Sequence, residues 1–94
     1  MNRKEFPIFS GLISYFPKAL REVSHISFMG NQQHHPDQPL HWDRSKSTDE
    51  LNSMMRHLVD YANGEEFDTD GTRHVSKVAW RALAFLEKEL EKYA

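Results

Sequence analysis

The sequence predicts an all-α fold with three main helices, an irregular apolar N-terminal arm, and a long loop between the first and second helices. Apolar residues recur every three or four positions in three separate segments, a spacing typical of amphipathic helices. No segment alternates polar and apolar residues with the period of two that a strand requires. The chain has 94 residues, the length of one domain, so we expect a single helical domain over residues 1–94.

The first predicted element is the apolar arm over residues 6–16, which a proline and a glycine interrupt. We expect this arm either to pack on the body of the domain or to be exchanged between the subunits of an oligomer. The first helix is predicted to begin at Pro17, because the first position of a helix needs no backbone N–H. Gly30-Asn31 predicts its end, and its apolar stripe consists of Leu20, Val23 and Ile26.

Residues 31–46 are predicted to form the long loop, since they contain two prolines and many polar residues. Loops of this length are uncommon in compact domains unless they are functional or disordered. Trp42 can stack on a nucleotide base, and Arg44 and Lys46 can bind phosphate oxygens. In the alternative interpretation, Trp42 fills the small core and the histidines face water. The candidate ligand-binding residues of this segment are His34, His41, Trp42, Arg44 and Lys46.

Two further helices complete the predicted fold. The second begins at a capping box, in which Ser47 accepts a hydrogen bond from the amide of Glu50 and Glu50 bonds back to Ser47. It ends at Asn63-Gly64, and an acidic loop over residues 65–71 leads into the last helix. Both helices are predicted to bury an apolar stripe, made of Leu51, Met54, Met55, Leu58, Val59 and Ala62 in the second and Val75, Val78, Ala79, Ala82, Leu83, Leu86, Leu90 and Tyr93 in the last.

The polar faces of these two helices carry further candidates for ligand binding and catalysis. Charged residues of the second helix share one face, and a basic strip of the last helix lies near its N-terminus, a position that favours phosphate. In the alternative interpretation, the first face is solvated and the basic strip pairs with the acidic loop. The residues are Asp49, Ser53, Arg56, His57 and Asp60 on the second helix, and His74, Lys77 and Arg81 on the last.

The acidic loop is the candidate metal site. Carboxylates are ligands that Mg²⁺ and Mn²⁺ prefer, and the loop contains Glu65, Asp68 and Asp70. No pair of histidines has the spacing of a zinc motif, and the twelve-residue EF-hand pattern is missing. Nucleophilic catalysis has no signature either, because the chain has no cysteine and no serine in a nucleophile elbow.

The composition limits the partners and the compartment. A net charge of −2 argues against general binding to a nucleic acid polymer or to a membrane surface. No apolar run reaches the ~20 residues of a membrane span, and the N-terminus lacks the pattern of a signal peptide. We therefore expect a cytoplasmic protein. A chain this small builds only a thin core, which favours a homo-oligomer over the alternative of a marginally stable monomer.

Several short motifs follow one another along the chain, namely Leu40-His41-Trp42-Asp43-Arg44-Ser45-Lys46-Ser47, Arg56-His57-Leu58, Asp70-Gly71, Arg73-His74 and Ala79-Trp80-Arg81-Ala82-Leu83. In this order they resemble a small phage-encoded family, the N-terminal domain of dATP/dGTP diphosphohydrolases. The chain departs from that family at Gln33-His34, where many relatives read Lys-Tyr, and at Lys77, where many read His. The resemblance implies an all-α fold, handling of purine deoxynucleotides, and a functional site at His34, Trp42, Asp49, Arg56, His57, Asp68, Asp70 and His74.

Two functions are consistent with these residues. The first is a Mg²⁺- or Mn²⁺-dependent hydrolase that cleaves a purine dNTP to the monophosphate and pyrophosphate, in the host cytoplasm if the protein is phage-encoded. Its candidate catalytic groups are Asp49, His57 and His74, its metal ligands Glu65, Asp68 and Asp70, and its phosphate ligands Arg56, Lys77 and Arg81. The second is a phage oligomer that captures a nucleotide, or another phosphorylated small molecule such as an immune signalling nucleotide, without cleaving it. A structural subunit with an incidental polar face is the third alternative.

Overall fold

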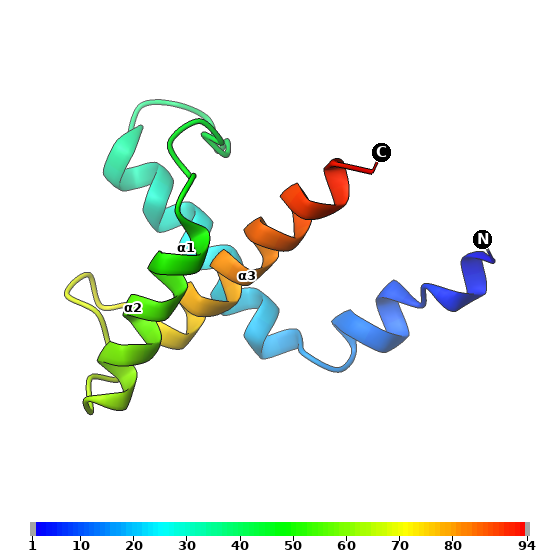
Figure 1. Cartoon of the computed structure of the whole chain (residues 1–94), viewed down its shortest axis with the longest axis horizontal. Coiled ribbons are helices and arrows are strands. Elements are labelled where there is room, and N and C mark those ends of the chain that lie inside the picture. Colours follow the sequence, from blue (N-terminus) through cyan, green and yellow to red (C-terminus); the bar gives the residue numbers. More distant parts are fainter. Residues whose placement is uncertain (1, 94) are drawn as a thin grey trace.

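The computed structural model describes residues 2–93, and every element of regular secondary structure in this range is a helix (Figure 1). Three long helices follow two short turns, η1 (Arg3–Glu5) and η2 (Phe9–Ile13). The long helices are α1 (Pro17–His34), α2 (Glu50–Ala62) and α3 (His74–Glu91). The predicted all-α fold with three main helices is therefore confirmed.

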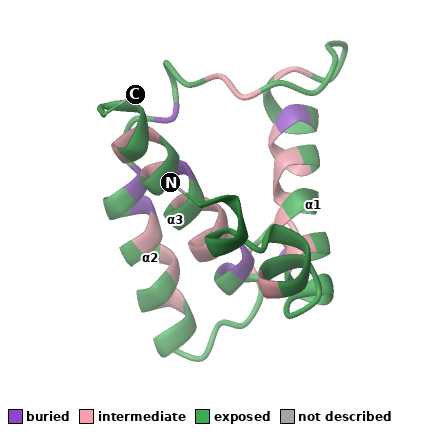
Figure 2. Ribbon diagram, turned by 90° about the vertical axis from the view of Figure 1, so that its right-hand side faces the viewer, coloured by how far each residue is buried: buried purple, intermediate pink, exposed green. Residues whose placement is uncertain are grey.

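Helix α3 is the central element of the domain. It packs most extensively against α2 and less extensively against α1, and it lies between the two (Figure 2). The segment 35–49 connects α1 to α2, and the shorter segment 63–73 connects α2 to α3. No helix within residues 2–93 is both long and apolar enough to cross a membrane.

Helix α1 begins at Pro17 as predicted but ends later than the glycine suggested. It continues through Gly30 and Asn31 to His34, because Gly30 keeps a helical backbone. The Asn31 side chain then ties down the end of the helix, since its Nδ2 donates to the carbonyl of His35 at 3.4 Å and to that of Gln38 at 3.0 Å. The stop signal at Gly30-Asn31 was thus wrong by one turn, and the long loop begins at His35.

The start of α2 also differs from the prediction. Asp49 is the N-cap residue, and no side chain caps the helix. The Ser47 hydroxyl instead donates to the carboxylate of Glu50, and Lys88 of α3 bonds both the Ser47 carbonyl and Glu50. The predicted capping box is wrong because a lysine distant in sequence binds the glutamate that would have capped the helix. Burial raises the pKa of Glu50, but the hydrogen bonds from Ser47 and Lys88 outweigh it and lower the pKa overall.

The end of α2 is the predicted one. Gly64 has a φ of 91°, the left-handed conformation that favours glycine. The amide of Glu65 donates to the carbonyl of Asp60 at 3.0 Å, and that of Gly64 donates to the carbonyl of Tyr61 at 3.0 Å. These two bonds form a Schellman motif, which folds the chain back on the last turn of α2.

A single chain has almost no apolar core. Among residues 2–93, Ala84 is the only apolar residue that is fully buried, while large apolar residues of α2 and α3 are exposed. Exposed residues recur along both helices (Figure 2). The predicted burial of both stripes is therefore wrong for the isolated chain. The N-terminal arm does not pack on the body either, and Phe9 and Tyr15 are each 71% exposed. The exposed stripe residues are Leu51, Met55, Leu58, Val59, Val75, Leu83, Leu86, Leu90 and Tyr93.

Candidate functional site

A cavity of about 550 Å³ lies where α1 and the loop over 35–49 face α3. Helix α1 lines it with Ser27, Asn31 and His34, the loop with His41, Trp42 and Lys46, and α3 with Lys77, Trp80 and Arg81. This volume falls within the range of roughly 300–1,000 Å³ that is typical of small-molecule sites. The cavity therefore combines segments that are far apart in the sequence.

Two tryptophans form an aromatic wall of this cavity. The rings of Trp42 and Trp80 meet edge to face, with centroids 5.8 Å apart and planes at 80°. The indole N–H of Trp80 donates to the Ser27 hydroxyl at 2.8 Å and so joins α3 to α1. The guanidinium of Arg44 lies 4.3 Å from the Trp42 centroid and also binds Glu91 at 2.6 Å. Protein contacts thus fix the orientation of both rings before any ligand arrives.

Several buried polar atoms around the cavity have no hydrogen-bond partner. They are Oδ1 of Asn31, Nε2 of His35 and Nε1 of Trp42, and all three residues line the cavity. An unsatisfied buried polar group costs about 1–3 kcal/mol, so such groups are rare in folded proteins. A polar ligand in the cavity is the kind of partner that would satisfy them.

The cationic side chains that line the cavity differ in how closely other protein groups bind them. Lys46 is mostly exposed, and its Nζ lies 3.9 Å from a carboxylate oxygen of Asp43. Arg81 donates to the Ser47 hydroxyl at 3.4 Å and lies 3.8 Å from the carboxylate of Glu50. Both contacts are long, so these two cations retain hydrogen-bonding capacity toward an anionic ligand.

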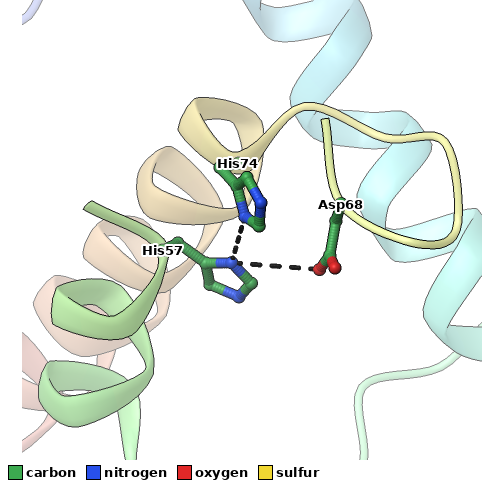
Figure 3. A group of neighbouring side chains, drawn as sticks. All are labelled: His57, Asp68 and His74. Atoms are coloured by element: carbon green, nitrogen blue, oxygen red, sulfur yellow. Dashed lines mark hydrogen bonds and ion pairs between the residues drawn. The ribbon is translucent and has the colours of Figure 1, made fainter. Parts of the chain in front are cut away.

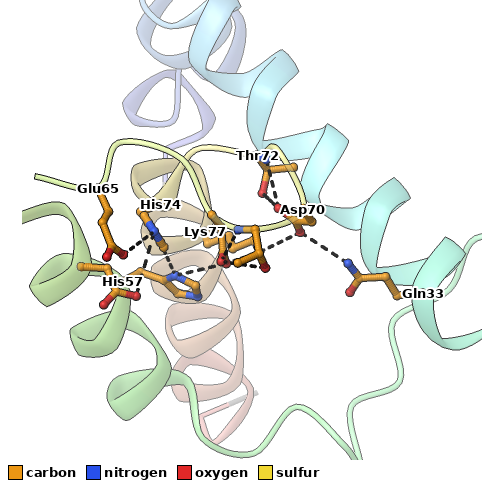
Figure 4. Close-up of polar contacts among 10 residues, drawn as sticks. Gln33, His57, Glu65, Asp70, Thr72, His74 and Lys77 are labelled. Carbon is orange, nitrogen blue, oxygen red and sulfur yellow. Dashed lines mark hydrogen bonds and ion pairs between the residues drawn. The ribbon is translucent and has the colours of Figure 1, made fainter.

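Lys77, in contrast, is fully engaged by the acidic loop (Figure 4). Its Nζ donates to Asp68 at 2.7 Å and to Asp70 at 2.8 Å. Burial lowers the pKa of Lys77, but the hydrogen bonds to the two carboxylates outweigh it and raise the pKa overall. The Lys77 bond lowers the pKa of Asp68, and for Asp70 the bonds from Lys77 and Thr72 overcome the opposing effect of burial. All three groups are therefore charged at neutral pH, and the charge of Lys77 is compensated.

Beside this cluster, two histidines bond to each other (Figure 3). Nδ1 of His57 lies 2.9 Å from Nδ1 of His74 and 3.9 Å from a carboxylate oxygen of Asp68. His57 lines the cavity, whereas His74 lies behind it and is only 2% exposed. Burial, followed by the positive charge of Lys77, lowers the pKa of His57. His57 is therefore neutral at pH 7 and can donate through one ring nitrogen and accept through the other.

The structure brings some of the predicted site residues together and separates others. Asp49 and Arg56 form an exposed pair at 3.5 Å outside the cavity, Arg44 is bound to Glu91, and His74 is buried behind His57. The predicted residues that line the cavity are His34, His41, Trp42, Lys46, His57, Asp70, Lys77 and Arg81.

The three predicted metal ligands do not share one site. Asp68 and Asp70 both bind Lys77, whereas Glu65 lies beside His74 at the end of α2. The amino group of Lys77 occupies the position between the two aspartates that a cation would need, so this carboxylate set does not fit Mg²⁺ or Mn²⁺ as arranged. Within residues 2–93, the groups whose ligand atoms converge are His57, Asp68 and His74, and Asp60, Glu65 and His74.

Sequence reasoning assigned no site role to Asn31 and Trp80, which both line the cavity. Trp80 follows Lys77 by three positions and precedes Arg81, so the helical spacing of the basic strip already placed it on the same side of α3. The sequence indicates Asn31 only as a helix stop. Its role in the loop depends on the contact with Gln38, which no local pattern indicates.

Comparison with known proteins identifies the family. The model of the family described as "dATP/dGTP diphosphohydrolase, N-terminal" matches residues 5–94. No curated protein and no solved structure matches the chain. The family match spans the three helices, the loop and the cavity described above. The chain therefore belongs to the family of dATP/dGTP diphosphohydrolase N-terminal domains.

Proposed function

We propose that the domain binds a purine nucleotide in the cavity between α1, the loop and α3. The observation that carries this proposal is the presence, in one cavity of about 550 Å³, of two tryptophans, basic side chains and unpartnered polar atoms. Aromatic rings suit a base, and cationic side chains suit phosphate. Membership of a family named for dATP/dGTP diphosphohydrolases supports the purine class.

Lys46 and Arg81 are the proposed phosphate ligands. Each lines the cavity, and neither has a short ion pair that a phosphate would have to displace. His34 and His41 line the same cavity and can donate to phosphate oxygens. Lys77 instead holds Asp68 and Asp70 in place, so it shapes the wall of the cavity more than it attracts an anion.

We propose capture of the nucleotide in preference to cleavage by this domain alone. Metal-assisted hydrolysis of a phosphoanhydride needs carboxylates that are free to hold the ion. The two loop aspartates next to the cavity both bind Lys77, and Asp43 accepts a hydrogen bond from Ser45 at 2.7 Å. Hydrolysis is the second candidate function, because the family name and the group formed by His57, Asp68 and His74 favour it.

We further propose that the functional unit is a homo-oligomer. With one apolar side chain fully buried among residues 2–93, the chain lacks the core that a stable monomer needs. Every copy of the chain exposes the same arm and the same stripes of α2 and α3, and each copy needs them covered. The partner that covers them is therefore a second copy of the chain. Such an assembly restores the burial that the apolar periodicity indicates.

Calorimetric titration combined with product analysis tests the proposed function. Protein is titrated with dATP, dGTP, dCTP and a cyclic purine dinucleotide as a representative signalling nucleotide, with and without Mg²⁺ or Mn²⁺. We expect saturable binding of a purine compound, which chromatography then recovers intact from heat-denatured protein. Recovery of monophosphate and pyrophosphate would show that the domain hydrolyses the nucleotide and would contradict capture. Absence of binding by every compound would refute both functions.

A further inference from the structure

We infer that Asp60, Glu65 and His74 form a binding site for a divalent transition-metal ion. The site lies at the junction of α2 and α3, at Nε2 of His74, whereas Nδ1 of the same ring faces His57 (Figure 4). It differs from the carboxylate set of the acidic loop, and it does not depend on the proposed binding of a nucleotide.

The distances around Nε2 of His74 fit metal ligands better than hydrogen-bond partners. Nε2 lies 4.0 Å from a carboxylate oxygen of Asp60 and 4.0 Å from one of Glu65. A hydrogen bond to oxygen spans about 2.7–3.2 Å, so neither carboxylate accepts from this nitrogen. Two ligand atoms that each bind one ion at about 2.0–2.2 Å lie about 3–4 Å apart. The arrangement therefore needs only small side-chain rotations to hold an ion.

The burial of His74 supports a metal ion at this site independently of the distances. Its side chain is only 2% exposed, and Nε2 is buried without any hydrogen-bond partner. A buried ring nitrogen between two carboxylates is costly if it stays unsatisfied. A metal ion at this position would satisfy Nε2 and bind both acids at once.

The backbone fixes the three residues relative to one another. The Schellman motif at Gly64 folds Glu65 back onto the last turn of α2, where its amide donates to the carbonyl of Asp60 at 3.0 Å. The amide of His74 donates to the carbonyl of Glu66 at 3.2 Å, which ties the first residue of α3 to the same turn. Preorganisation of this kind is what a metal site requires from its scaffold.

The neighbouring histidine completes the arrangement. When an ion occupies Nε2, the proton of His74 resides on Nδ1, which then donates to Nδ1 of His57 at 2.9 Å. Metal-ligating histidines commonly donate their other ring N–H to a neighbouring acceptor, which fixes the tautomer and the ring orientation. His57 is therefore a positioning residue for this site.

Charge favours this group over the alternative that uses Asp68. In the part of the chain that the structure describes, the ion pairs of Asp60 and Glu65 involve His74 and no lysine or arginine. Asp68 already binds Lys77 at 2.7 Å, and that ammonium group would repel a second cation. The two uncompensated carboxylates thus provide the charge that a divalent ion neutralises.

The donor set indicates which metals fit. One imidazole and two carboxylates suit Zn²⁺ and Mn²⁺, whereas Mg²⁺ prefers oxygen ligands alone. Asp60 and Glu65 are partly exposed, with side-chain exposures of 44% and 64%, so an ion can enter from solvent. Water would complete the coordination.

Titration calorimetry with ZnCl₂ on the full chain tests the site, with no nucleotide present. Glu65→Gln removes one ligand at an exposed position, and Glu66→Gln is the matched control, because Glu66 binds Arg73 instead. We expect Zn²⁺ affinity to fall at least tenfold in Glu65→Gln and in Asp60→Asn, and to stay within twofold of wild type in Glu66→Gln. Equal affinity in all four proteins, or no Zn²⁺ binding by the folded wild type, would overturn the inference.

Two-dimensional ¹H–¹⁵N spectra of the imidazole rings locate the ion directly. We expect the resonance of His74 Nε2 to shift on addition of Zn²⁺ and that of Nδ1 to remain that of a protonated nitrogen. This measurement separates the site from the histidines of the loop, where the rings of His35 and His41 lie 4.8 Å apart. A shift confined to those loop histidines would contradict the proposed site.

Discussion

Lys77 lines the cavity, yet it holds the site together through its bonds to protein carboxylates and is not a proposed ligand of the nucleotide. Its ammonium group joins Asp68 and Asp70 of the acidic loop to α3, and Asp70 also accepts from Gln33 of α1 at 3.4 Å. Because three segments meet at this cluster, the position of the cavity wall depends on it. The side chains of Lys77, Asp68 and Asp70 are 15–23% exposed, so solvent screens the charges only in part.

Replacement of Lys77 by Met should therefore destabilise the fold. The substitution leaves two carboxylates without their cation, and we expect the free energy of unfolding to fall by roughly 2–3 kcal/mol. Lys92→Met is the matched control, since Lys92 pairs with Glu89 on the surface and should change stability by less than about 1 kcal/mol. Denaturant titration followed by circular dichroism measures both. Equal stability of the two variants would show that the cluster contributes nothing.

The same cluster predicts a pH dependence. The folded state lowers the pKa of Asp68 and of Asp70 below the ordinary value of 3.8, so their stabilisation is complete above that value. As the pH falls below about 4 and through the folded-state pKa values, the carboxylates take up protons and the stabilisation is lost. We expect the free energy of unfolding of wild type to decrease below pH 4 more steeply than that of Lys77→Met. Parallel curves would mean that Lys77 does not cause these pKa shifts.

Lys46 tests the proposed phosphate contact. Its side chain is 72% exposed, so Lys46→Ala should leave the melting temperature unchanged. Loss of one charge-assisted contact at an exposed position should weaken purine nucleotide binding roughly fivefold to tenfold. Lys18→Ala, at an exposed position near the start of α1, is the charge-matched control and should bind like wild type. Unaltered affinity in Lys46→Ala would remove this lysine from the site.

At the scale of the elements, the sequence predicted the helix ends that local residues determine but not those that distant contacts determine. Pro17 and Gly64 were predicted correctly, because each acts through its own backbone. The ends that failed depend on distant partners: Asn31 reaches Gln38, and Lys88 binds Glu50. The cavity shows the same division. Periodicity placed Lys77 and Arg81 on one side of α3 but left open whether this strip binds a ligand or pairs with the acidic loop, and the structure shows the pairing for Lys77.

Two glycines provide a matched test of helix termination. Gly64 has a φ of 91°, so Gly64→Ala should cost about 1–2 kcal/mol of stability. Gly30 lies within α1, and a Cβ there would meet no atom within 4 Å. Gly30→Ala should therefore stabilise the fold by roughly 0.5–1 kcal/mol. Thermal denaturation of both variants checks the pair, and a change of the same sign in both would contradict the assigned backbone roles.

At the scale of the whole molecule, the apolar periodicity indicates surfaces that a single chain leaves open. The stripes of α2 and α3 are regular in sequence, yet Leu58, Leu83 and Leu86 are exposed. Sequence reasoning identified the stripes but not what covers them, because periodicity does not distinguish burial within a chain from burial between chains. The exposed arm adds further apolar residues that a single chain leaves uncovered.

Sedimentation velocity measures the assembly directly. We expect wild type to sediment as an oligomer and Phe9→Ser to shift toward smaller species, because Phe9 is exposed on the single chain and apolar. Lys4→Ser, at an exposed polar position just before the arm, should sediment like wild type. A monomeric wild type that unfolds cooperatively would contradict a homo-oligomer.

The most direct measurement of the central claim is a titration of intrinsic tryptophan fluorescence with dGTP. The chain has only two tryptophans, and both Trp42 and Trp80 line the cavity. We predict a saturable change in emission, with a midpoint that agrees with calorimetry and moves to higher concentration in Lys46→Ala. Nucleotide binding detected by calorimetry without any change in tryptophan emission would place the ligand elsewhere and contradict the proposed site.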